Sequence, residues 1–243
     1  MNVSEPPPIW KRKAVFLIIG LLIGAGITAR FCNLGRMAYW YDEAYTSLWI
    51  SGFHWSEATN DLANREVTPR DILRYQRIHP DRTVVDTVRA LADYDPHHPP
   101  LYYALVRIWA GLAGDSVGSV RSLSALAGVV VLPLIFWLCR LLFEKRSVAW
   151  VAVALVAVSP FHILYAREAR QYTLWMVLTL LSTVALLRAT DSRSVRAWCA
   201  YSLTVAAGLY VHLLFFTVLA AHGMYIGLAA LQPWPPKGRE ASP

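Results

Sequence analysis

Long uninterrupted apolar runs constrain this chain more than any other feature. They lie near residues 14–34, 117–140, 148–166 and 173–190, and a longer apolar stretch covers residues 197–231. A helix needs about 17 to 25 apolar residues to cross a bilayer. With 56% hydrophobic and only 16% charged residues, the chain is not an ordinary soluble domain. We expect an all-α, polytopic membrane protein.

Basic residues predict the orientation, because Lys and Arg near span ends are retained in the cytoplasm. The stretch 197–231 is too long for one span, so we divide it near His212 into two short helices that form a tight hairpin. Six crossings with both termini inside the cell then satisfy every basic cluster: Lys11, Lys13, Arg140, Lys145, Arg146, Arg188, Arg193, Arg196, Lys237 and Arg239.

We expect a multi-pass protein of the plasma membrane, and this topology divides its chain into three parts. We expect residues 1–13 to be a cytoplasmic N-terminus, residues 14–231 a transmembrane module and residues 232–243 a Pro-rich, disordered cytoplasmic tail. The basic start before the first apolar run has no cleavage site, so we interpret that run as an uncleaved signal anchor. Gly20 and Gly24 in this run form a GxxxG pattern, which we assign to helix packing.

The first extracytoplasmic loop, residues 35–116, is long enough to hold interfacial helices of its own. Residues 70–93 alternate charged and apolar residues at helical spacing, with a break at Pro80. Residues 99–113 are too short for a span and contain Arg107, and a crossing there would put Lys145 outside. We therefore expect an amphipathic interfacial helix with these aromatic residues at headgroup level: Tyr102, Tyr103 and Trp109.

Charge and cysteine content exclude several classes of protein. The net charge of +7 comes from scattered basic residues with no basic stripe, so we expect no nucleic-acid partner. The three cysteines lie in or at the end of apolar runs without CxxC spacing, so neither a disulfide framework nor a zinc site is implied.

Asp42 and Glu43 follow the first apolar run within an aromatic segment that includes Tyr41. One interpretation is an interfacial aromatic belt with two solvated acids. The other is a carboxylate near the headgroups that acts as a general base, with the aromatic rings stacked on a sugar. Asp42 and Glu43 could also supply oxygen ligands to a divalent metal such as Mg or Mn, which the sequence does not decide.

Each of the other candidate site residues has both a structural and a functional interpretation. His97 and His98 either end the polar loop or contact a phosphate. Arg121, near the outer end of the run 117–140, either snorkels to the headgroups or neutralises a lipid phosphate. The tight connection between the third and fourth runs is either a charged hairpin loop or a phosphate site, and it contains Arg167, Glu168, Arg170 and Tyr172.

These motifs together resemble the GT-C glycosyltransferases of the protein-mannosyltransferase and aminoarabinose-transferase type, the bacterial family-39-like group. The resemblance covers residues 14–231 and agrees in order and spacing. It rests on Trp40 to Tyr45, His98 to Tyr103, Gly114 to Ser116, Arg121 to Leu126, Ser159 to Tyr172, and the turn Tyr210 to His212.

The resemblance implies a polyprenyl-phosphate-sugar donor, an inverting transfer and an active site at the outer membrane surface. Asp42 would activate the acceptor beside Glu43, Arg121 would lie near the donor phosphate, and the Arg167–Tyr172 loop would border the site. The acceptor is left open among glycan, lipid and protein. Such enzymes have more spans than six, so we expect an N-terminal half whose activity alone is open. The alternative is a non-catalytic membrane protein or transporter fragment that binds lipid phosphate.

Overall fold

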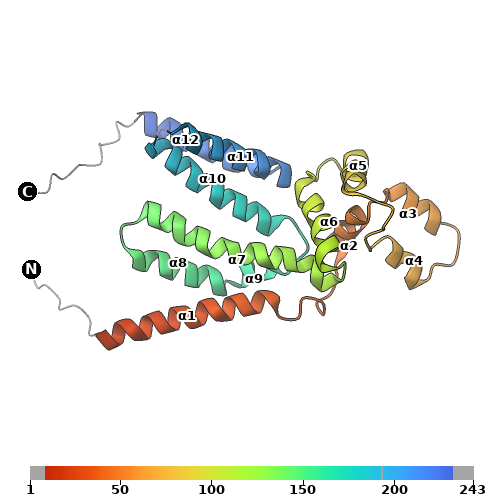
Figure 1. Cartoon of the computed structure of the whole chain (residues 1–243), viewed down its shortest axis with the longest axis horizontal. Helices are drawn as coiled ribbons and strands as arrows, with labels where there is room; N and C mark the ends of the chain where they lie inside the picture. The colour runs from red at the N-terminus through yellow and green to blue at the C-terminus, as the bar shows by residue number, and fades with distance from the viewer. Residues whose placement is uncertain (1–8, 193, 232–243) are drawn as a thin grey trace, which may run out of the picture.

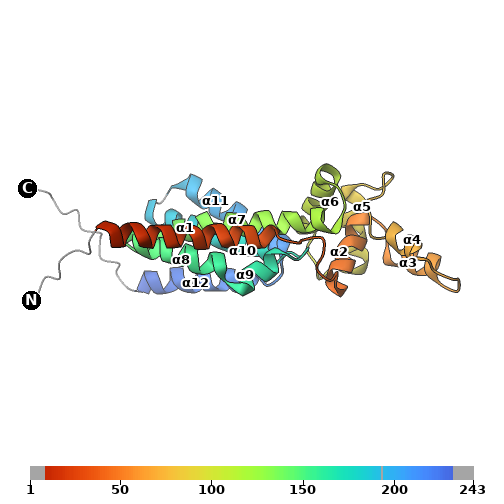
Figure 2. The ribbon, with the colours of Figure 1, turned by 90° about the horizontal axis from the view of Figure 1, so that it is seen from below.

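The computed structural model describes residues 9–192 and 194–231, with side chains from residue 13 onward. In this part of the chain the regular structure consists of α-helices, which confirms the all-α prediction. The longer helices lie side by side in one bundle, and the short helices α2 to α6 form a separate cluster at one end of it (Figures 1 and 2). We call this cluster, residues 35–116, the loop domain.

Among the described residues, three helices are long and apolar enough to cross a membrane. They are α1 (Ile9–Phe31), α7 (Val117–Leu142) and α10 (Tyr172–Ser192). A fourth candidate is the pair α8 (Arg146–Val158) and α9 (Pro160–Ala166), which is bent by 60°. The helices α11 (Val195–Val211) and α12 (Phe215–Leu231) have 17 residues each. The chain is thus a polytopic membrane protein, while six full crossings stay a prediction.

The sequence predicted one span over residues 148–166, but the structure breaks it between α8 and α9. Pro160 has no N–H to donate to the preceding turn. Arg30, which is 1% exposed, donates from Nη1 to the Ala157 carbonyl at 2.7 Å and from Nη2 to the Val156 carbonyl at 3.2 Å. The guanidinium therefore supplies donors to carbonyl groups at the break, although the Val156 carbonyl also accepts the Ser159 N–H at 3.4 Å.

The GxxxG pattern does not mark the helix contact that we assigned to it. A Cβ added at Gly20 or Gly24 would meet nothing within 4 Å, whereas one at Gly26 would lie 2.2 Å from the Ala157 carbonyl oxygen. The close approach of α1 to α8 therefore depends on Gly26, and the prediction for Gly20 and Gly24 was wrong.

The stretch 197–231 divides at His212, as the sequence predicted. His212 ends α11 in an extended conformation, and its Nδ1 accepts the Leu214 N–H at 3.1 Å. A Cβ on Gly208 would lie 2.3 Å from the Phe215 ring, so a residue without a side chain permits the tight hairpin. Inside this part of the bundle, His222 contacts Thr183 and Tyr201 at 3.2 and 3.3 Å.

The loop domain contains α2 (Tyr41–Ser51), α3 (Trp55–Leu62), α4 (Pro69–Arg74), α5 (Val84–Tyr94) and α6 (Leu101–Ala113). Side-chain carboxylates cap the starts of three of these helices, and at α3 Glu57 accepts the His54 N–H at 2.7 Å. Asp71 accepts the Thr68 N–H at 2.8 Å, and Asp86 accepts the Thr83 N–H at 2.7 Å. The helical segment 70–93 is interrupted around Pro80, as its pattern predicted.

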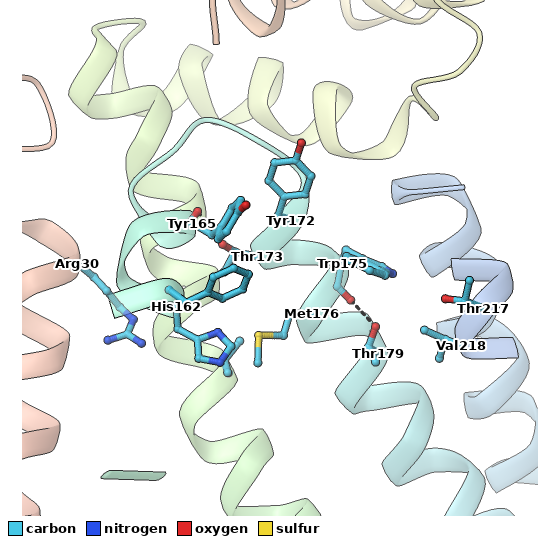
Figure 3. Close-up of a pocket in the computed structure, with 13 residues that line it drawn as sticks. Arg30, His162, Tyr165, Tyr172, Thr173, Trp175, Met176, Thr179, Thr217 and Val218 are labelled. Carbon is cyan, nitrogen blue, oxygen red and sulfur yellow. Dashed lines mark hydrogen bonds between the residues drawn. The ribbon is translucent and has the colours of Figure 1, made fainter. Parts of the chain in front are cut away.

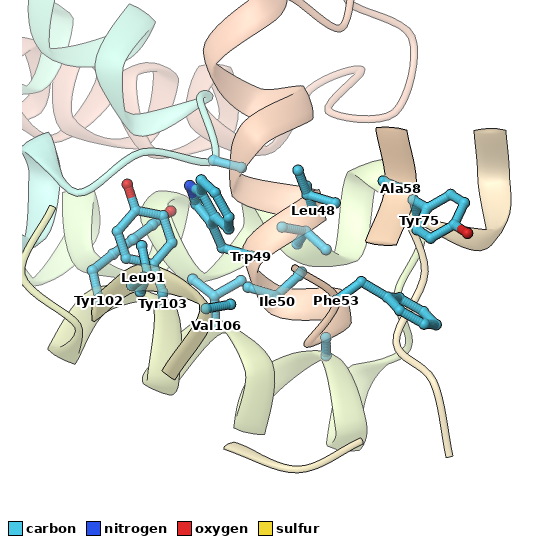
Figure 4. Close-up of a cluster of buried hydrophobic side chains, with 14 residues drawn as sticks. Leu48, Trp49, Ile50, Phe53, Ala58, Tyr75, Leu91, Tyr102, Tyr103 and Val106 are labelled. Atoms are coloured by element: carbon cyan, nitrogen blue, oxygen red, sulfur yellow. The ribbon is translucent and has the colours of Figure 1, made fainter. Parts of the chain in front are cut away.

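The core of the loop domain packs α2 against α5 and α6 (Figure 4). Tyr102 and Tyr103 are 1% and 0% exposed, so they lie in this core and not on a surface that faces headgroups. Arg107 is also buried. It donates to the carbonyls of Ile50 at 2.5 Å and His79 at 2.9 Å, and also to those of Ser51 and Arg82. The helix at 101–113 is confirmed, while the exposure expected for its tyrosines is corrected.

Basic residues gather at the end of the bundle that lies away from the loop domain (Figure 1). The start of α1, the α7–α8 turn and the α10–α11 turn meet there, and they carry Lys13, Arg140, Lys145, Arg146, Arg188 and Arg196. The expected disordered tail 232–243, residues 1–8, Arg193 and the side chain of Lys11 lie outside the described residues.

Candidate functional site

A cavity of about 400 Å³ opens where the loop domain meets the connection between α9 and α10. Its walls combine acidic, basic and aromatic side chains from α2, α3, the end of α5 and two loops. The lining residues are Tyr41, Asp42, Tyr45, Trp49, Trp55, Tyr94, Asp95, His98 and Arg170. We call it the polar cavity.

Asp42 lies in the first turn of α2, where the positive end of the helix dipole favours a carboxylate. Its side chain is 31% exposed, and Oδ2 lies 3.6 Å from Nη2 of Arg170. A carboxylate in this position is open to a ligand on one side and held near a guanidinium on the other. Both sequence-predicted residues therefore meet at the polar cavity.

Arg170 is buried but incompletely satisfied. Nη2 lies 3.2 Å from Nε2 of His98, and Nη1 makes long contacts of 3.4 Å with the Tyr103 hydroxyl and the Asp42 carbonyl. Its Nε has no hydrogen-bond partner in the described part of the chain. Burial raises the pKa of Tyr103, so this phenol stays neutral beside the guanidinium. Arg170 keeps capacity to bind an anion.

Asp95 is a site residue that sequence reasoning missed. Its Oδ2 lies 2.8 Å from Nδ1 of His98, in a turn closed by the His98 N–H and the Asp95 carbonyl at 3.0 Å. Because an arginine N–H only donates, Nε2 of His98 accepts from Arg170, and the proton of a neutral ring then lies on Nδ1, on the side of the Asp95 carboxylate. An acid three residues before a His-Pro-Pro segment was the available signal, because a turn brings such residues together.

Glu43 and Arg121 form a separate, fully buried pair. Arg121 donates from Nε to Oε1 of Glu43 at 2.7 Å and from Nη2 to Oε2 at 2.5 Å. Its remaining N–H groups go to three main-chain carbonyls, at 2.6, 3.2 and 2.9 Å, of Leu34, Met37 and Ala38. Since all five N–H groups are used, no donor is left for the lipid phosphate that we expected Arg121 to bind.

Glu43 is likewise occupied within the protein. Its Oε1 accepts the Ala169 N–H at 2.8 Å in addition to Arg121, and its side chain is 0% exposed. The catalytic role and the metal-ligand role considered for it are therefore not supported by its contacts. The pair instead joins α2, α7, the 34–38 loop and the connection after α9, and so fixes the position of Asp42.

The charged residues in the connection after α9 differ in their contacts. Arg167 donates from Nη2 to the Cys32 carbonyl at 2.8 Å, which ties this connection to the end of α1. Glu168 has a buried Oε2 without a hydrogen-bond partner in the described residues. Burial, and then the nearby charge of Glu43, raises the pKa of the Glu168 carboxyl. Neither side chain lines the polar cavity.

The remaining predicted residues lie around the site. Tyr41, 71% exposed, is at the rim of the polar cavity, and His97 is exposed outside it. Tyr102 is in the core, with its hydroxyl 3.1 Å from Oγ of Ser124. Tyr172 begins α10, with its ring 5.7 Å from the Arg170 guanidinium.

A second cavity of about 570 Å³ lies among the membrane helices (Figure 3). We call it the bundle cavity. Tyr172 lies at the end of this cavity nearer the loop domain, and Arg30 and His162 lie on one side. Most of its other lining is apolar or aromatic and includes Val131, Phe161, Tyr165, Trp175, Met176 and Val218. Tyr172 lines the bundle cavity and Arg170 lines the polar cavity, and the Tyr172 ring lies 5.7 Å from the Arg170 guanidinium.

No group of three or more His, Cys, Asp or Glu side chains is arranged to hold a metal among the residues that the structure describes. Asp42 and Glu43 point to different partners, so they do not form a common ligand pair. The use of a divalent metal stays open.

Comparison with known proteins gives one match. A family model described as dolichyl-phosphate-mannose-protein mannosyltransferase matches residues 97–234, more than half of the chain. This range includes His98, Arg121 and Arg170 but not Asp42. No curated protein and no solved structure matches the chain.

Proposed function

The chain belongs to the dolichyl-phosphate-mannose-protein mannosyltransferase family. From this premise we propose which reaction takes place in its polar cavity. The chain is a membrane glycosyltransferase of the GT-C type. It transfers a sugar from a polyprenyl-phosphate donor to an acceptor hydroxyl, with inversion, at the extracytoplasmic face of the plasma membrane. The observation that carries this proposal is the pairing of Asp42 with the incompletely satisfied Arg170, 3.6 Å apart.

The donor lipid occupies both cavities, with its prenyl chain in one and its phosphate beside the other. The prenyl chain occupies the bundle cavity, whose apolar lining suits a hydrocarbon. The phosphate then lies beside Tyr172 and binds Arg170, because a guanidinium forms strong charge-assisted hydrogen bonds with phosphate oxygens. His98 supports this site by accepting from Arg170 through Nε2.

Asp42 acts as the general base. It accepts the proton of the acceptor hydroxyl while that oxygen attacks the anomeric carbon from the face opposite the phosphate. The bond between the anomeric carbon and the phosphate oxygen breaks, and the negative charge that develops on the leaving lipid phosphate is stabilised by Arg170. Inversion follows from this single displacement.

The basic end of the bundle supports the proposed orientation. Since Lys and Arg are retained in the cytoplasm, the loop domain and the polar cavity face the extracytoplasmic side. A donor lipid in the outer leaflet can then reach both cavities.

The test is a transfer assay with a radiolabelled polyprenyl-phosphate sugar in membrane vesicles. We expect Asp42→Asn to lower the rate by about 100- to 10,000-fold, the usual contribution of a general base, with donor binding retained. Asp81→Asn is a matched control, because Asp81 is 86% exposed and does not line the cavity. If Asp42→Asn transferred sugar at the wild-type rate, Asp42 would not be the general base. A wild-type chain that bound the donor without transferring sugar would be a non-catalytic lipid-phosphate binder.

A further inference from the structure

The wall of the polar cavity that belongs to the loop domain is mostly aromatic. Five of its lining residues are aromatic and come from three helices: Tyr41, Tyr45, Trp49, Trp55 and Tyr94. Trp55 and Tyr94 are 44% and 43% exposed, so the core of the domain does not account for them. Grouped aromatic side chains that stay in contact with solvent indicate a binding surface.

Contacts between helices hold this wall in place before any ligand binds. The rings of Tyr45 and Trp55 stack with centroids 5.5 Å apart at 21°, which joins α2 to α3. The Tyr94 hydroxyl lies 2.7 Å from Oγ of Ser56, and the Tyr94 ring meets His54 edge-on at 5.1 Å. The end of α5 is thereby fixed against the start of α3. A rigid wall lowers the entropy lost on binding.

Carboxylates complete the same cavity. Asp42 and Asp95 both line it, and their ionised carboxylates are acceptors only, while the aromatic faces carry partial negative charge. A pyranose ring matches both features, because its C–H groups pack on an aromatic face and its hydroxyls donate to carboxylates. A stretch of nucleic acid also stacks on aromatic rings, but its phosphates would be repelled by the two acids.

The position of the wall separates the acceptor from the donor. Arg170 and Tyr172 lie on the side of the membrane helices, where the donor phosphate enters in the proposed reaction. The aromatic wall belongs to the loop domain, and α3 lies beyond α2 from the bundle (Figure 1). A ligand on this wall approaches Asp42 from the side opposite to the lipid.

We propose that the acceptor is a carbohydrate, bound with a pyranose ring against Trp55 and Tyr94 and a hydroxyl at Asp95. This inference rests on the proposed function and names its acceptor class. The acceptor hydroxyl that reacts lies at Asp42, one subsite nearer to the membrane.

Saturation-transfer NMR on the full chain in nanodiscs with bound polyprenyl phosphate tests the proposal. The probes are methyl mannopyranoside, methyl glucopyranoside and the blocked peptide acetyl-Ala-Thr-Ala-amide. We expect a signal from at least one pyranoside, strongest at its C–H face, and none above background from the peptide. Trp55→Ala and Tyr94→Ala should each weaken pyranoside binding about fivefold or more, as expected for loss of one aromatic contact.

Two variants control for folding. Tyr94→Phe keeps the ring and should retain binding, and Trp198→Ala removes an exposed tryptophan of α11, which does not line the cavity, and should have no effect. The proposal is overturned if the peptide alone gives a signal, or if Trp55→Ala and Tyr94→Ala bind pyranosides like the wild type. The reaction at Asp42 would survive either result, because it is tested separately by loss of transfer in Asp42→Asn.

Discussion

At the scale of single residues, two acid–arginine pairs in the same region have different roles. Arg121 donates every N–H to Glu43 and the main chain, while Arg170 keeps unused capacity beside the partly exposed Asp42. Both arginines are buried, so burial alone does not distinguish a structural residue from a binding residue. These two arginines differ in how many of their N–H groups are satisfied, and in that only Arg170 lines the polar cavity.

Glu43→Gln tests the structural role of the first pair. Removing one partner leaves a buried guanidinium without its counter-charge, which costs about 3–5 kcal/mol. We expect a large fall in the thermal unfolding midpoint in detergent, compared with less than about 1 kcal/mol for Asp42→Asn on the partly exposed neighbouring acid. Wild-type stability of Glu43→Gln together with selective loss of transfer would instead assign Glu43 to the chemistry.

The raised pKa of Glu168 predicts that the protein becomes more stable as the pH falls through this pKa. Its folded-state pKa is raised by burial and by Glu43, so the ionised form destabilises the fold above that pKa and this cost disappears as pH falls through it. We expect Glu168→Gln to raise the free energy of unfolding at neutral pH, because the neutral amide places no charge in this desolvated position.

The measurement is thermal unfolding of wild type and Glu168→Gln between pH 4 and pH 8. The difference between the two proteins should shrink toward acid pH, where the wild-type carboxyl is protonated. A difference that stays constant over this range would show that ionisation of Glu168 is not its cause.

Sequence patterns placed several site residues but not their partners. Asp42, His98 and Arg170 were predicted from local motifs, and the structure brings them together. Asp95 and the aromatic residues Trp55 and Tyr94 were not predicted, because their positions depend on how α3 and α5 pack against α2. For the same reason the sequence did not show that the N–H groups of Arg121 would all bind Glu43 and main-chain carbonyls.

At the scale of elements, apolar runs predicted the membrane helices and the turn at His212, because length and hydropathy are local properties. Which face of a helix packs against its neighbour depends on residues far away in the sequence. Gly20 and Gly24 matched a packing pattern, but a Cβ added at either would meet nothing within 4 Å, while one at Gly26 would meet Ala157. The sequence predicted one span over residues 148–166, and the break at Pro160 also depends on Arg30 from a distant helix.

Gly26→Ala and Gly20→Ala are a matched pair that tests this contact. The Cβ at position 26 would lie 2.2 Å from a main-chain oxygen of α8, so α1 must move away, at a cost of about 1–3 kcal/mol. Gly20→Ala meets no atom and should stay within about 1 kcal/mol of the wild type. Thermal unfolding of the two variants in the same detergent measures both values, and equal stability of the two would contradict the α1–α8 contact.

At the scale of the whole molecule, the loop domain and the basic helix ends lie at opposite ends of the bundle (Figure 2). The fold class and the separation of loop domain from membrane helices followed from the sequence. The packing inside the loop domain did not, because Tyr102, Tyr103 and Arg107 look amphipathic in sequence and are buried by α2 and α5.

Reporter fusions test the orientation of the molecule. A reporter active only outside the cytoplasm should be active after residue 60, in α3, and inactive after residue 145, in the α7–α8 turn. A fluorescent protein that folds only in the cytoplasm should give the reverse result. The same activity at both sites would contradict an arrangement with these segments on opposite faces.

The central claim is that a lipid phosphate binds where Asp42, His98 and Arg170 meet, and phosphorus NMR with spin labels measures this most directly. The three native cysteines, Cys32, Cys139 and Cys199, are first replaced by serine. Polyprenyl phosphate is then added below one lipid per protein in nanodiscs. We expect a nitroxide on His97→Cys to broaden the phosphomonoester resonance strongly, a nitroxide on Lys145→Cys to leave it sharp, and Arg170→Met to reduce the first effect. Broadening by the label at position 145 alone would contradict the account.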